Sequence, residues 1–477
     1  MSKAHWPMPK NKFYITTSIA YTNASPHIGF ALELIQADTV ARYQRLSGRN
    51  VFFLTGTDEH GQKVVKAAEN ANKKPEEFTD EISSQFKRLK EVLNLSNDDF
   101  IRTTDKVRHW PVVQKIWLKL KENGDIYKKK YQGLYCVGCE AFITKKDLVD
   151  GKCKIHQKEP EVIEEENYFF RLSKYAKEIE EKIEKDEVKI IPRERKNEIL
   201  SFIRQGLEDV SFSRPRKDLK WGIPVPDDDS QTVYVWADAL VNYLSALGYP
   251  NGKNFKDCWP PDIQFIGKDI LRFHAVIWLG ILLSLKLELP KSIFIHGYLT
   301  SGGRKMSKSL GNVVDPFELV KKYGTDPVRY FLLREIPSTE DGDFSYEKFE
   351  ERYNADLAKG LGNLVARILT LSKNIKQKED KFGKETEKVE NNLRKSLTEL
   401  KFSEALISVW GLISACDRYI EEERPWEEKE NQKEIVGNLL FALSEIAGLV
   451  KAFLPETSEK IVKQIKIQKS ESLFPRL

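Results

Sequence analysis

The sequence predicts an α/β fold: a Rossmann-type parallel sheet, split by a zinc-knuckle insertion and followed by an all-α helix bundle. β-branched and aromatic runs alternate with helical segments up to about residue 122 and again from about residue 231, as in doubly wound sheets. Between these stretches the alternation lapses around a compact group of cysteines and a histidine. Beyond about residue 350, apolar residues recur every three or four positions, which is typical of bundle helices.

The first strand is expected at residues 13–19, FYITTSI, because β-branched and aromatic residues favour buried strands. A helix is expected over about 30–46, a second strand at 51–56 and a further helix from about Gln62. After the insertion, three more strands are expected, with an apolar helix near 270–285 between the last two. These strands are QTVYVWAD at 231–238, DIQFIG at 262–267 and SIFIHGYL at 292–299.

Three apolar stripes predict long helices in the C-terminal part of the chain. They run from Leu357 to Leu371, from Leu406 to Ile420 and from Leu439 to Phe453, in steps of three or four residues. The segment 372–396 is rich in charged residues and is expected to be a solvated connection between the helices.

The bulk composition predicts a soluble globular protein of several structural units. The chain has 477 residues, 40% hydrophobic and 31% charged, and its net charge of +5 permits an RNA partner without requiring one. No apolar signal segment is visible in the first dozen residues, and the longest apolar stretch, Ala275 to Leu285, is too short to span a bilayer. Five cysteines, an odd number, argue against a disulfide framework and for a reducing, cytoplasmic setting with no membrane partner.

A histidine–glycine motif opens the first expected helix, in the string Pro26-His27-Ile28-Gly29-Phe30. Helix N-termini present free N–H groups and the positive end of a dipole, which suit a phosphate chain. Gly29 would let a nucleotide approach the backbone, and His27 could donate to phosphate oxygens. Taken alone, an H-x-G triplet more often marks a capped helix with a loop histidine.

A basic loop flanked by glycines lies beyond the resumed sheet. Two lysines stand three positions apart in it, and the string Ser301-Gly302-Gly303-Arg304 is followed by Lys305-Met306-Ser307-Lys308-Ser309. Such a loop can close over a polyanion, with each lysine acting as a point charge on phosphate. Any lysine pair can also be a plain solvated loop, but the whole string is far rarer by chance.

The insertion carries two close pairs of metal-ligand residues, separated by thirteen residues. Two such pairs on knuckle turns can place three thiolates and one imidazole around a tetrahedral Zn²⁺ ion. The predicted ligands are Cys136, Cys139, Cys153 and His156. The alternative is a group of core cysteines without metal, which is less common for paired spacing of this kind.

Together, the two phosphate-type motifs resemble the HIGH and KMSKS signatures of class I aminoacyl-tRNA synthetases, in that family's order. From about residue 13 to about 460, further strings resemble methionyl-tRNA synthetases in particular. They are Ala20-Tyr21-x-Asn23, Gly56-Thr57-Asp58-Glu59-His60-Gly61, Val233-Tyr234-Val235-Trp236-Ala237-Asp238, Gly267-Lys268-Asp269-Ile270 and Phe273-His274. The resemblance implies that ATP and L-methionine form methionyl-adenylate and pyrophosphate, and that the methionyl group then passes to the 3′ end of tRNA(Met).

The resemblance implies that both signatures hold ATP, with Mg²⁺, while the methionine carboxylate attacks the α-phosphate. Catalysis would then be positioning and charge stabilisation by His27, Lys305 and Lys308, with no protein nucleophile. Phe30 stands where the family usually has a second histidine and cannot hydrogen-bond to ATP, so Asn23 is a candidate replacement. The residues expected to bind ATP are His27, Gly29, Asn23, Gly267, Asp269, Lys305, Met306, Ser307 and Lys308.

A methionine side chain offers mainly a polarizable thioether, which aromatic walls can hold through sulfur–aromatic contacts of about 0.3–1.5 kcal/mol each. The substrate ammonium needs an acidic partner, and Asp58 matches the family's position at the end of a strand. The residues expected to bind methionine are Ala20, Tyr21, Asp58, Trp236, Tyr243, Phe273 and His274. Each aromatic could instead be ordinary core, and Trp278 is the candidate for which core packing is favoured.

The resemblance also implies that the helical domain reads the anticodon through Asn363, Arg367 and Trp426. Asn363 and Arg367 are four residues apart and share a helix face, and an exposed tryptophan can stack on an unpaired base. Without the resemblance, Trp426 would be assigned to packing on its own bundle. The chain ends at Leu477, soon after the bundle, so a monomer is expected.

The expected divisions of the chain follow from these observations. They are 10–122 and 231–300 for the halves of the Rossmann domain, 123–230 for the insertion with its zinc knuckle at about 131–160, 301–350 for the KMSKS loop and a region contacting the tRNA stem, and 351–477 for the anticodon-binding domain.

Two alternatives stand beside methionine–tRNA ligation. A class I synthetase for cysteine would need metal ligands in the sheet's own pocket, and the branched-chain synthetases carry a large editing insertion that this sequence lacks. A non-catalytic tRNA-binding paralogue is the second alternative, and Phe30 is the feature that favours it.

Overall fold

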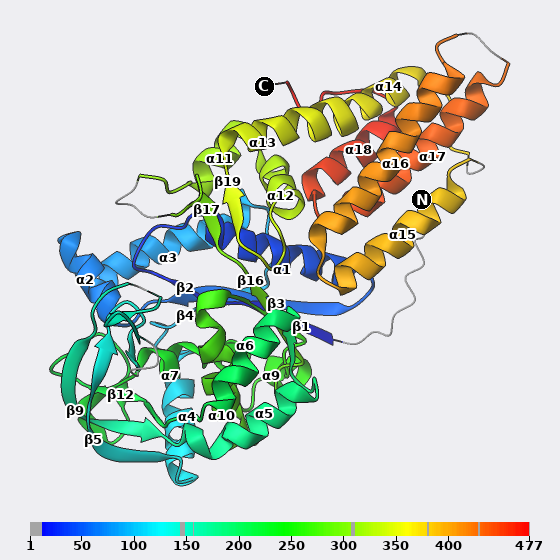
Figure 1. Cartoon of the computed structure of the whole chain (residues 1–477). Coiled ribbons are helices and arrows are strands. Elements are labelled where there is room, and N and C mark those ends of the chain that lie inside the picture. The colour runs from blue at the N-terminus through cyan, green and yellow to red at the C-terminus, as the bar shows by residue number, and fades with distance from the viewer. Residues whose placement is uncertain are drawn as a thin grey trace.

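The computed structural model of the chain describes residues 12–143, 148–155, 157–306, 311–378, 381–427 and 430–476. In these ranges a parallel sheet lies between two layers of helices, and a helix bundle packs beyond one of the layers (Figure 1). No helix in these ranges has the length and apolar character needed to cross a membrane.

The central sheet has seven strands among the described residues, and its pairings are parallel. Ile15, in the middle of β1, lies opposite Ile263 of β15 and Phe53 of β3, so the centre of the sheet is apolar. The order is β10-β16-β15-β1-β3-β2, with β4 also paired to β3. The strands are β1 (Lys12–Thr17), β2 (Ala20–Tyr21), β3 (Asn50–Asp58), β4 (Asp99–Arg102), β10 (Lys189–Ile191), β15 (Ile263–Gly267) and β16 (Ser292–His296).

The strands expected at 13–19, 51–56, 262–267 and 292–299 are confirmed with small shifts at their ends. The strand expected at 231–238 is wrong. β14 (Asp228–Val233) pairs antiparallel with β12 (Ser213–Pro215) and β13 (Pro224–Val225) in a separate sheet, and Val235–Ala239 forms the short helix α7. The run is buried on all sides, and a short apolar run of this kind has no periodicity that separates strand from helix.

The insertion is built on a long antiparallel pair, β5 (Ile126–Cys136) with β9 (Glu161–Phe170). The insertion also contains β6 (Ala141–Ile143) and the hairpin of β7 (Leu148–Val149) and β8 (Lys152–Cys153). Cys136 ends β5 and Cys153 ends β8. The central sheet resumes earlier than the expected residue 231, because β10 pairs in parallel with β16.

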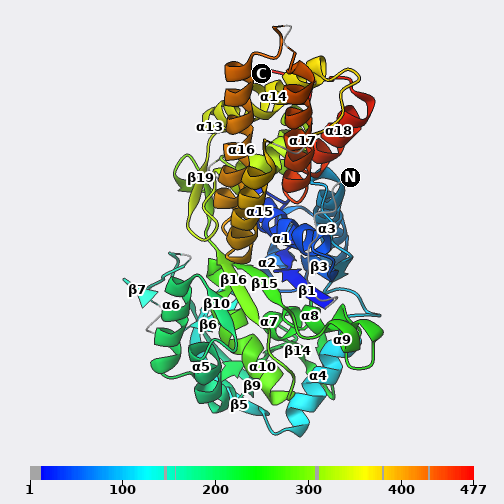
Figure 2. The same ribbon diagram turned by 90° about the vertical axis from the view of Figure 1, so that its right-hand side faces the viewer.

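Helices cover both faces of the sheet (Figure 1 and Figure 2). α1 (Ile28–Leu46) and α3 (Pro75–Val92) lie on the side of the bundle, and α4 (Trp110–Glu122), α6 (Arg193–Arg204) and α10 (Leu279–Ser284) lie on the opposite side. The apolar helix expected near 270–285 is confirmed, and its first part, Phe273–Trp278, is a π-helical segment. Such segments are frequent at functional sites, and this one contributes side chains to the main cavity.

The bundle comprises α14 (Asn363–Leu371), α15 (Gly383–Thr398), α16 (Phe402–Glu423), α17 (Gln432–Val450) and α18 (Pro455–Ile467). The three predicted apolar stripes are buried, apart from the partly exposed Leu371. The connection expected over 372–396 is wrong from Gly383 onward, because α15 is a full helix that packs along α16. Val389, Leu393 and Leu397 form its buried stripe, which is so narrow that the charged residues dominate the composition.

A fully buried arginine joins the bundle to the sheet layer. Arg329 lies on α12 (Thr325–Arg334), and its Nη2 is 2.8 Å from the Asp38 Oδ2 atom of α1. The same guanidinium donates to the carbonyl oxygens of Phe453, between α17 and α18, and of Leu93, at the end of α3. Four segments that are distant in the sequence therefore meet at one side chain.

Candidate active site

A cavity of about 820 Å³ opens where the parallel strands end. Its walls come from the segment after β1, the start of α1, the carboxyl ends of β3, β15 and β16, and the cysteine region of the insertion. Ligand sites of open α/β sheets gather at this edge. Most of the residues singled out in the sequence line it: Ala20, Tyr21, His27, Gly29, Asp58, Trp236, Tyr243, Gly267, Asp269, Phe273, His274, Lys305 and Met306.

The histidine–glycine motif forms the N-terminus of α1. His27 is the N-cap residue, and its Nδ1 atom accepts a hydrogen bond of 3.0 Å from the Gly29 N–H group. Burial, and then the charge of Lys305, lower the pKa of His27. The ring is therefore neutral with its proton on Nε2, ready to donate to an anion. A Cβ atom at Gly29 would lie 2.8 Å from His27 Cε1, so the ring can take this position only over a glycine.

Phe30, which was not expected to bind ATP, has a packing role, and Asn23, its candidate replacement, does not line the cavity. Phe30 packs edge-on against Phe86, with 5.2 Å between ring centroids, and so fills space beside the cavity. Asn23 is exposed and is not among the residues that line the cavity, so its expected contact with ATP gains no support from the structure.

A hairpin brings Lys305 to the cavity wall, near His27. β17 (Leu299–Ser301) and β18 (Arg304–Lys305) are joined through Gly302 and Gly303, whose φ angles of 62° and 69° suit glycine and a tight hairpin turn. The Lys305 Nζ atom lies 4.6 Å from the centroid of the Tyr298 ring, and Met306 also lines the cavity. Ser307 and Lys308 lie outside the described residues.

Two residues that the sequence analysis did not single out form an ion pair in the cavity wall. His296 Nε2 is 2.8 Å from Glu33 Oε2, and His296 Nδ1 is 2.7 Å from the Gly297 carbonyl oxygen. Burial alone lowers the pKa of His296, but the hydrogen bond and charge of Glu33 outweigh it, so the net pKa is raised. Both ring nitrogens face acceptors, so the ring is an imidazolium. The sequence carried one sign of this ion pair, because Glu33 is a charged residue inside the otherwise apolar run at the start of α1.

Aromatic side chains form the apolar end of the cavity. The rings of Trp236 and Phe273 are stacked, with centroids 3.7 Å apart and planes 6° apart. Tyr243 Oη donates to His274 Nε2 at 2.8 Å, and His274 Nδ1 donates to the Ile270 carbonyl oxygen at 3.1 Å. Burial lowers the pKa of His274 to about 4, so this ring is neutral. The slot thus has rigid aromatic walls and no charge.

Trp278 does not line the cavity. It is fully buried, and its Nε1 atom donates to Gln264 Oε1 at 3.2 Å. The interpretation of Trp278 as core is therefore confirmed.

A buried carboxylate stands beside the aromatic slot. Asp58 ends β3, and burial, then the charges of Asp238 and Glu140, raise its pKa well above the usual range of an aspartate. Among the described residues, its Oδ1 atom is buried without a hydrogen-bond partner. A buried carboxylate of this kind is most stable beside a cation. Tyr21 and Glu140 border it, and Glu140 accepts from the Lys63 N–H group at 2.9 Å, at the start of α2 (Gln62–Asn70).

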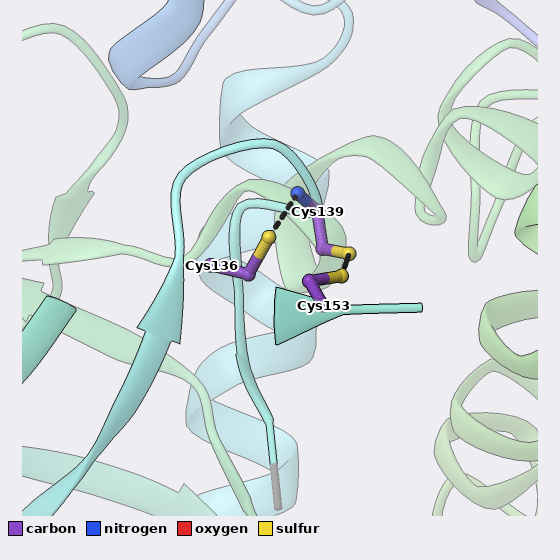
Figure 3. A group of neighbouring side chains, drawn as sticks. All are labelled: Cys136, Cys139 and Cys153. Carbon is purple, nitrogen blue, oxygen red and sulfur yellow. Dashed lines mark hydrogen bonds between the residues drawn. The ribbon is translucent and has the colours of Figure 1, made fainter. Parts of the chain in front are cut away.

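Three cysteines of the insertion lie close together (Figure 3), and two of them, Cys139 and Cys153, line the cavity. The Sγ atoms of Cys136, Cys139 and Cys153 lie within 4.8 Å of one another, and those of Cys139 and Cys153 are 3.6 Å apart. Thiolates on a tetrahedral Zn²⁺ ion are about 3.8 Å apart, given Zn–S bonds of about 2.3 Å. The three thiols could therefore hold zinc, and all are free of disulfides. The fourth predicted ligand, His156, lies outside the described residues.

The three residues expected to read an anticodon gather on the bundle. Asn363 is exposed at the start of α14, and Arg367 follows one turn later. The Arg367 guanidinium lies 5.8 Å from the centroid of the Trp426 ring, which is 49% exposed. Arg367 also pairs with Glu421 at 2.6 Å. An exposed tryptophan beside an arginine and an amide is a surface on which unpaired bases can stack and hydrogen-bond.

Comparisons with known proteins agree on one family. The family model of the class I tRNA synthetases (M) matches residues 13–147 and 143–369. The methionine–tRNA ligase of Caldanaerobacter subterraneus subsp. tengcongensis is 42% identical over 98% of this chain and 79% of its own length. That of Brucella melitensis biotype 1 is 44% identical over 95% of this chain and 92% of its own.

Solved structures give the same answer. Mycobacterium tuberculosis methionyl-tRNA synthetase bound by methionyl-adenylate superposes with a TM-score of 0.90 at 36% identity, over 98% of this chain and 99% of that one. The apo form of the same enzyme superposes with a TM-score of 0.84 at 34% identity, over 98% of each chain. The chain belongs to the class I (M) family of tRNA synthetases, the family of the methionine–tRNA ligases.

Proposed function

We propose that the chain is a methionine–tRNA ligase, which activates L-methionine with ATP and transfers the methionyl group to tRNA(Met). One observation carries the proposal: a single cavity joins a helix N-terminus and a lysine to a buried carboxyl group with an unpaired oxygen and to an uncharged aromatic slot. These parts match the phosphates, the ammonium and the thioether of the two substrates. The family relationship supports the same activity.

In the first step, a methionine carboxylate oxygen attacks the α-phosphorus of ATP, and the bond from that phosphorus to the pyrophosphate oxygen breaks. The positive end of the α1 dipole would face the phosphates, His27 Nε2–H would donate to a phosphate oxygen, and Lys305 would add positive charge. Mg²⁺ would accompany ATP. The chain itself supplies positioning and charge, which can provide most of the acceleration of such a transfer.

The ammonium of methionine would pair with Asp58, and its side chain would lie in the slot of Trp236, Phe273, Tyr243 and His274. Because His274 is neutral and its Nε2 atom already accepts from Tyr243, the slot offers a thioether no competing charge. Gly267 and Asp269 also line the cavity, and the nucleoside of ATP would lie against them.

Phe30 does not favour the non-catalytic alternative. Its ring packs on Phe86 and leaves His27 and Gly29 in place at the N-terminus of α1. A tRNA-binding paralogue without activation would have no use for a buried carboxyl group with an unpaired oxygen at Asp58.

Two further parts belong to this proposal. A zinc ion held by Cys136, Cys139 and Cys153, with His156, would cross-link the insertion beside the cavity. The helical domain from about residue 351 would read the anticodon through Asn363, Arg367 and Trp426, and residues 301–350 would meet the tRNA stem.

The activity is tested by methionine-dependent ATP–pyrophosphate exchange with the wild-type chain and with Lys305→Ala. The wild type should exchange with L-methionine and ATP. The lysine variant should lose roughly 10²-fold in kcat, as for loss of one charge-stabilising group, with the methionine KM nearly unchanged. Arg304→Ala is the matched control, because Arg304 is the neighbouring exposed cation on β18 and does not line the cavity. Absence of exchange in the wild type would refute the proposed function.

Asp58→Asn should raise the methionine KM in the same assay by roughly 10- to 100-fold, the value of a hydrogen bond to a charged group, without changing the ATP KM. Since burial raises the pKa of Asp58, protonation at acidic pH should remove the same contact in the wild type. The wild-type methionine KM should therefore rise as pH falls through that raised pKa, and the asparagine variant should show no such rise. Asp99→Asn, a carboxylate on β4 outside the cavity, should behave as wild type. An unchanged methionine KM in Asp58→Asn would exclude this role.

Metal content should follow the cysteine cluster. The purified wild type should contain about one zinc per chain, and Cys136→Ser should lose most of it, because one thiolate ligand is removed. Cys258→Ser, which changes a half-buried cysteine outside the cluster, should keep the metal. Elemental analysis by mass spectrometry measures this directly, and a metal-free wild type or a fully loaded Cys136→Ser protein would contradict the site.

Trp426→Ala should raise the KM for tRNA(Met) in aminoacylation by roughly 10- to 100-fold, because stacking on one base contributes about 1–3 kcal/mol. Exchange without tRNA should stay unchanged, since the residue lies on the bundle. Ile407→Ala is the matched control, because Ile407 is a bundle side chain with the same 49% exposure. Equal effects of the two substitutions on tRNA would argue against anticodon reading at Trp426.

A further inference from the structure

A buried hydrogen-bonded chain lies behind the aromatic slot and has no part in the mechanism above. Asp238 Oδ2 is 2.6 Å from His60 Nδ1, and Asp238 Oδ1 is 2.7 Å from His109 Nε2. His109 Nδ1 is 2.7 Å from Ser245 Oγ. All four side chains are buried, and none of them lines the cavity.

The chain is anchored on one ionised carboxylate. Burial alone would raise the pKa of Asp238, but the two imidazoles outweigh it and lower that pKa. Each ring therefore carries a proton on the nitrogen that faces Asp238. A buried carboxylate with two such donors is held in one orientation, because losing either donor would leave a charge short of its hydrogen bonds.

Three members of this chain each stand two residues from a side chain of the cavity. His60 follows Asp58 at the end of β3, Asp238 follows Trp236 in α7, and Ser245 follows Tyr243 in α8 (Asn242–Ser245). The fourth, His109, precedes α4 and links the other segments. One network thus reaches the segments that carry the carboxylate and two aromatic walls.

The two helices involved cannot hold their own position. α7 has five residues, α8 has four, and neither has a side-chain cap. Helices of this length are unstable without tertiary contacts. Asp238 supplies such a contact to α7, and Ser245 supplies one to α8. The stacking of Trp236 on Phe273 therefore depends on where Asp238 is held.

We propose that Asp238 is a positioning residue for methionine recognition: through His60, His109 and Ser245 it keeps Asp58, Trp236 and Tyr243 in fixed relative positions. The inference rests on the proposed function, since it assigns these three residues to methionine. The negative charge of Asp238 also lies close enough to act on Asp58, which adds to the attraction of that corner for an ammonium.

The test is Asp238→Asn, which keeps the size of the side chain but sets an amide N–H group against one imidazole N–H group. In ATP–pyrophosphate exchange, the methionine KM should rise roughly 10- to 100-fold, while kcat and the ATP KM change less than about threefold. Asp125→Asn is the matched control. Asp125 is a buried carboxylate that accepts from Lys174 and Ser284 and does not line the cavity. It should lower the melting temperature similarly and leave the methionine KM unchanged.

Ser245→Ala provides a milder variant if Asp238→Asn does not fold. It removes the hydrogen bond to His109 and a longer one to the Asn242 carbonyl oxygen, and it should raise the methionine KM several-fold. In each variant, the methionine affinity measured by calorimetry without ATP should weaken by the same factor as the methionine KM of that variant rises. The proposal would be overturned if the methionine and ATP KM values changed equally. It would also be overturned if Asp238→Asn and Asp125→Asn changed the methionine KM to the same extent. A wild type that binds methionine but forms no adenylate would refute the ligase function and leave the calorimetric test standing.

Discussion

Two buried carboxylates of helix α1 fix its position in the molecule, one facing the cavity and the other facing the helix bundle. Toward the cavity, Glu33 accepts from Ser18 and pairs with His296. Toward the bundle, Asp38 pairs with Arg329 and is nearly without exposure. Burial of an ion pair does not by itself stabilise a fold, but removing one partner costs about 3–5 kcal/mol, because the other is then left uncompensated. Both pairs therefore specify a geometry: they allow α1 one position between sheet and bundle.

That geometry sets the distance between the cavity and the bundle. His27 caps α1, and Asp38 lies three turns further along it, about 16 Å at 1.5 Å per residue. Arg329 then connects Asp38 to the corner between α17 and α18. A tRNA that placed its acceptor end at the cavity and its anticodon on the bundle would meet two sites separated by rigid, interlocked helices. Such a substrate can be selected by length as well as by contacts.

Sequence reasoning succeeded where the signal is local or periodic. The central strands, the bundle stripes and the helix capped by His27 follow from residue type and spacing, and the proximity of Cys136, Cys139 and Cys153 follows from their metal-ligand spacing. It failed at 231–238 because the run is buried and has no periodicity that separates strand from helix, and because the hydrogen-bond partners of Asp238 in α7 are two histidines distant in the sequence. It failed at α15 because three apolar residues on one face matter more to folding than the many charged ones around them. The ion pair of Glu33 and His296 was missed for a similar reason, because neither residue indicates a site until the fold places the two side chains together.

The cavity wall contains polar groups that favour opposite charges, and this combination limits what can bind productively. Lys305 and the α1 N-terminus favour negative charge, whereas Asp58 favours positive charge. A zwitterionic amino acid can satisfy both only with its carboxylate toward the phosphates and its ammonium toward Asp58. The side chain must then enter the slot between Trp236 and Tyr243, where no charge is available. In the proposed complex, orientation would come from electrostatics and selectivity from shape, so substitution of the residues that hold the slot in place would change methionine affinity without changing the chemical step.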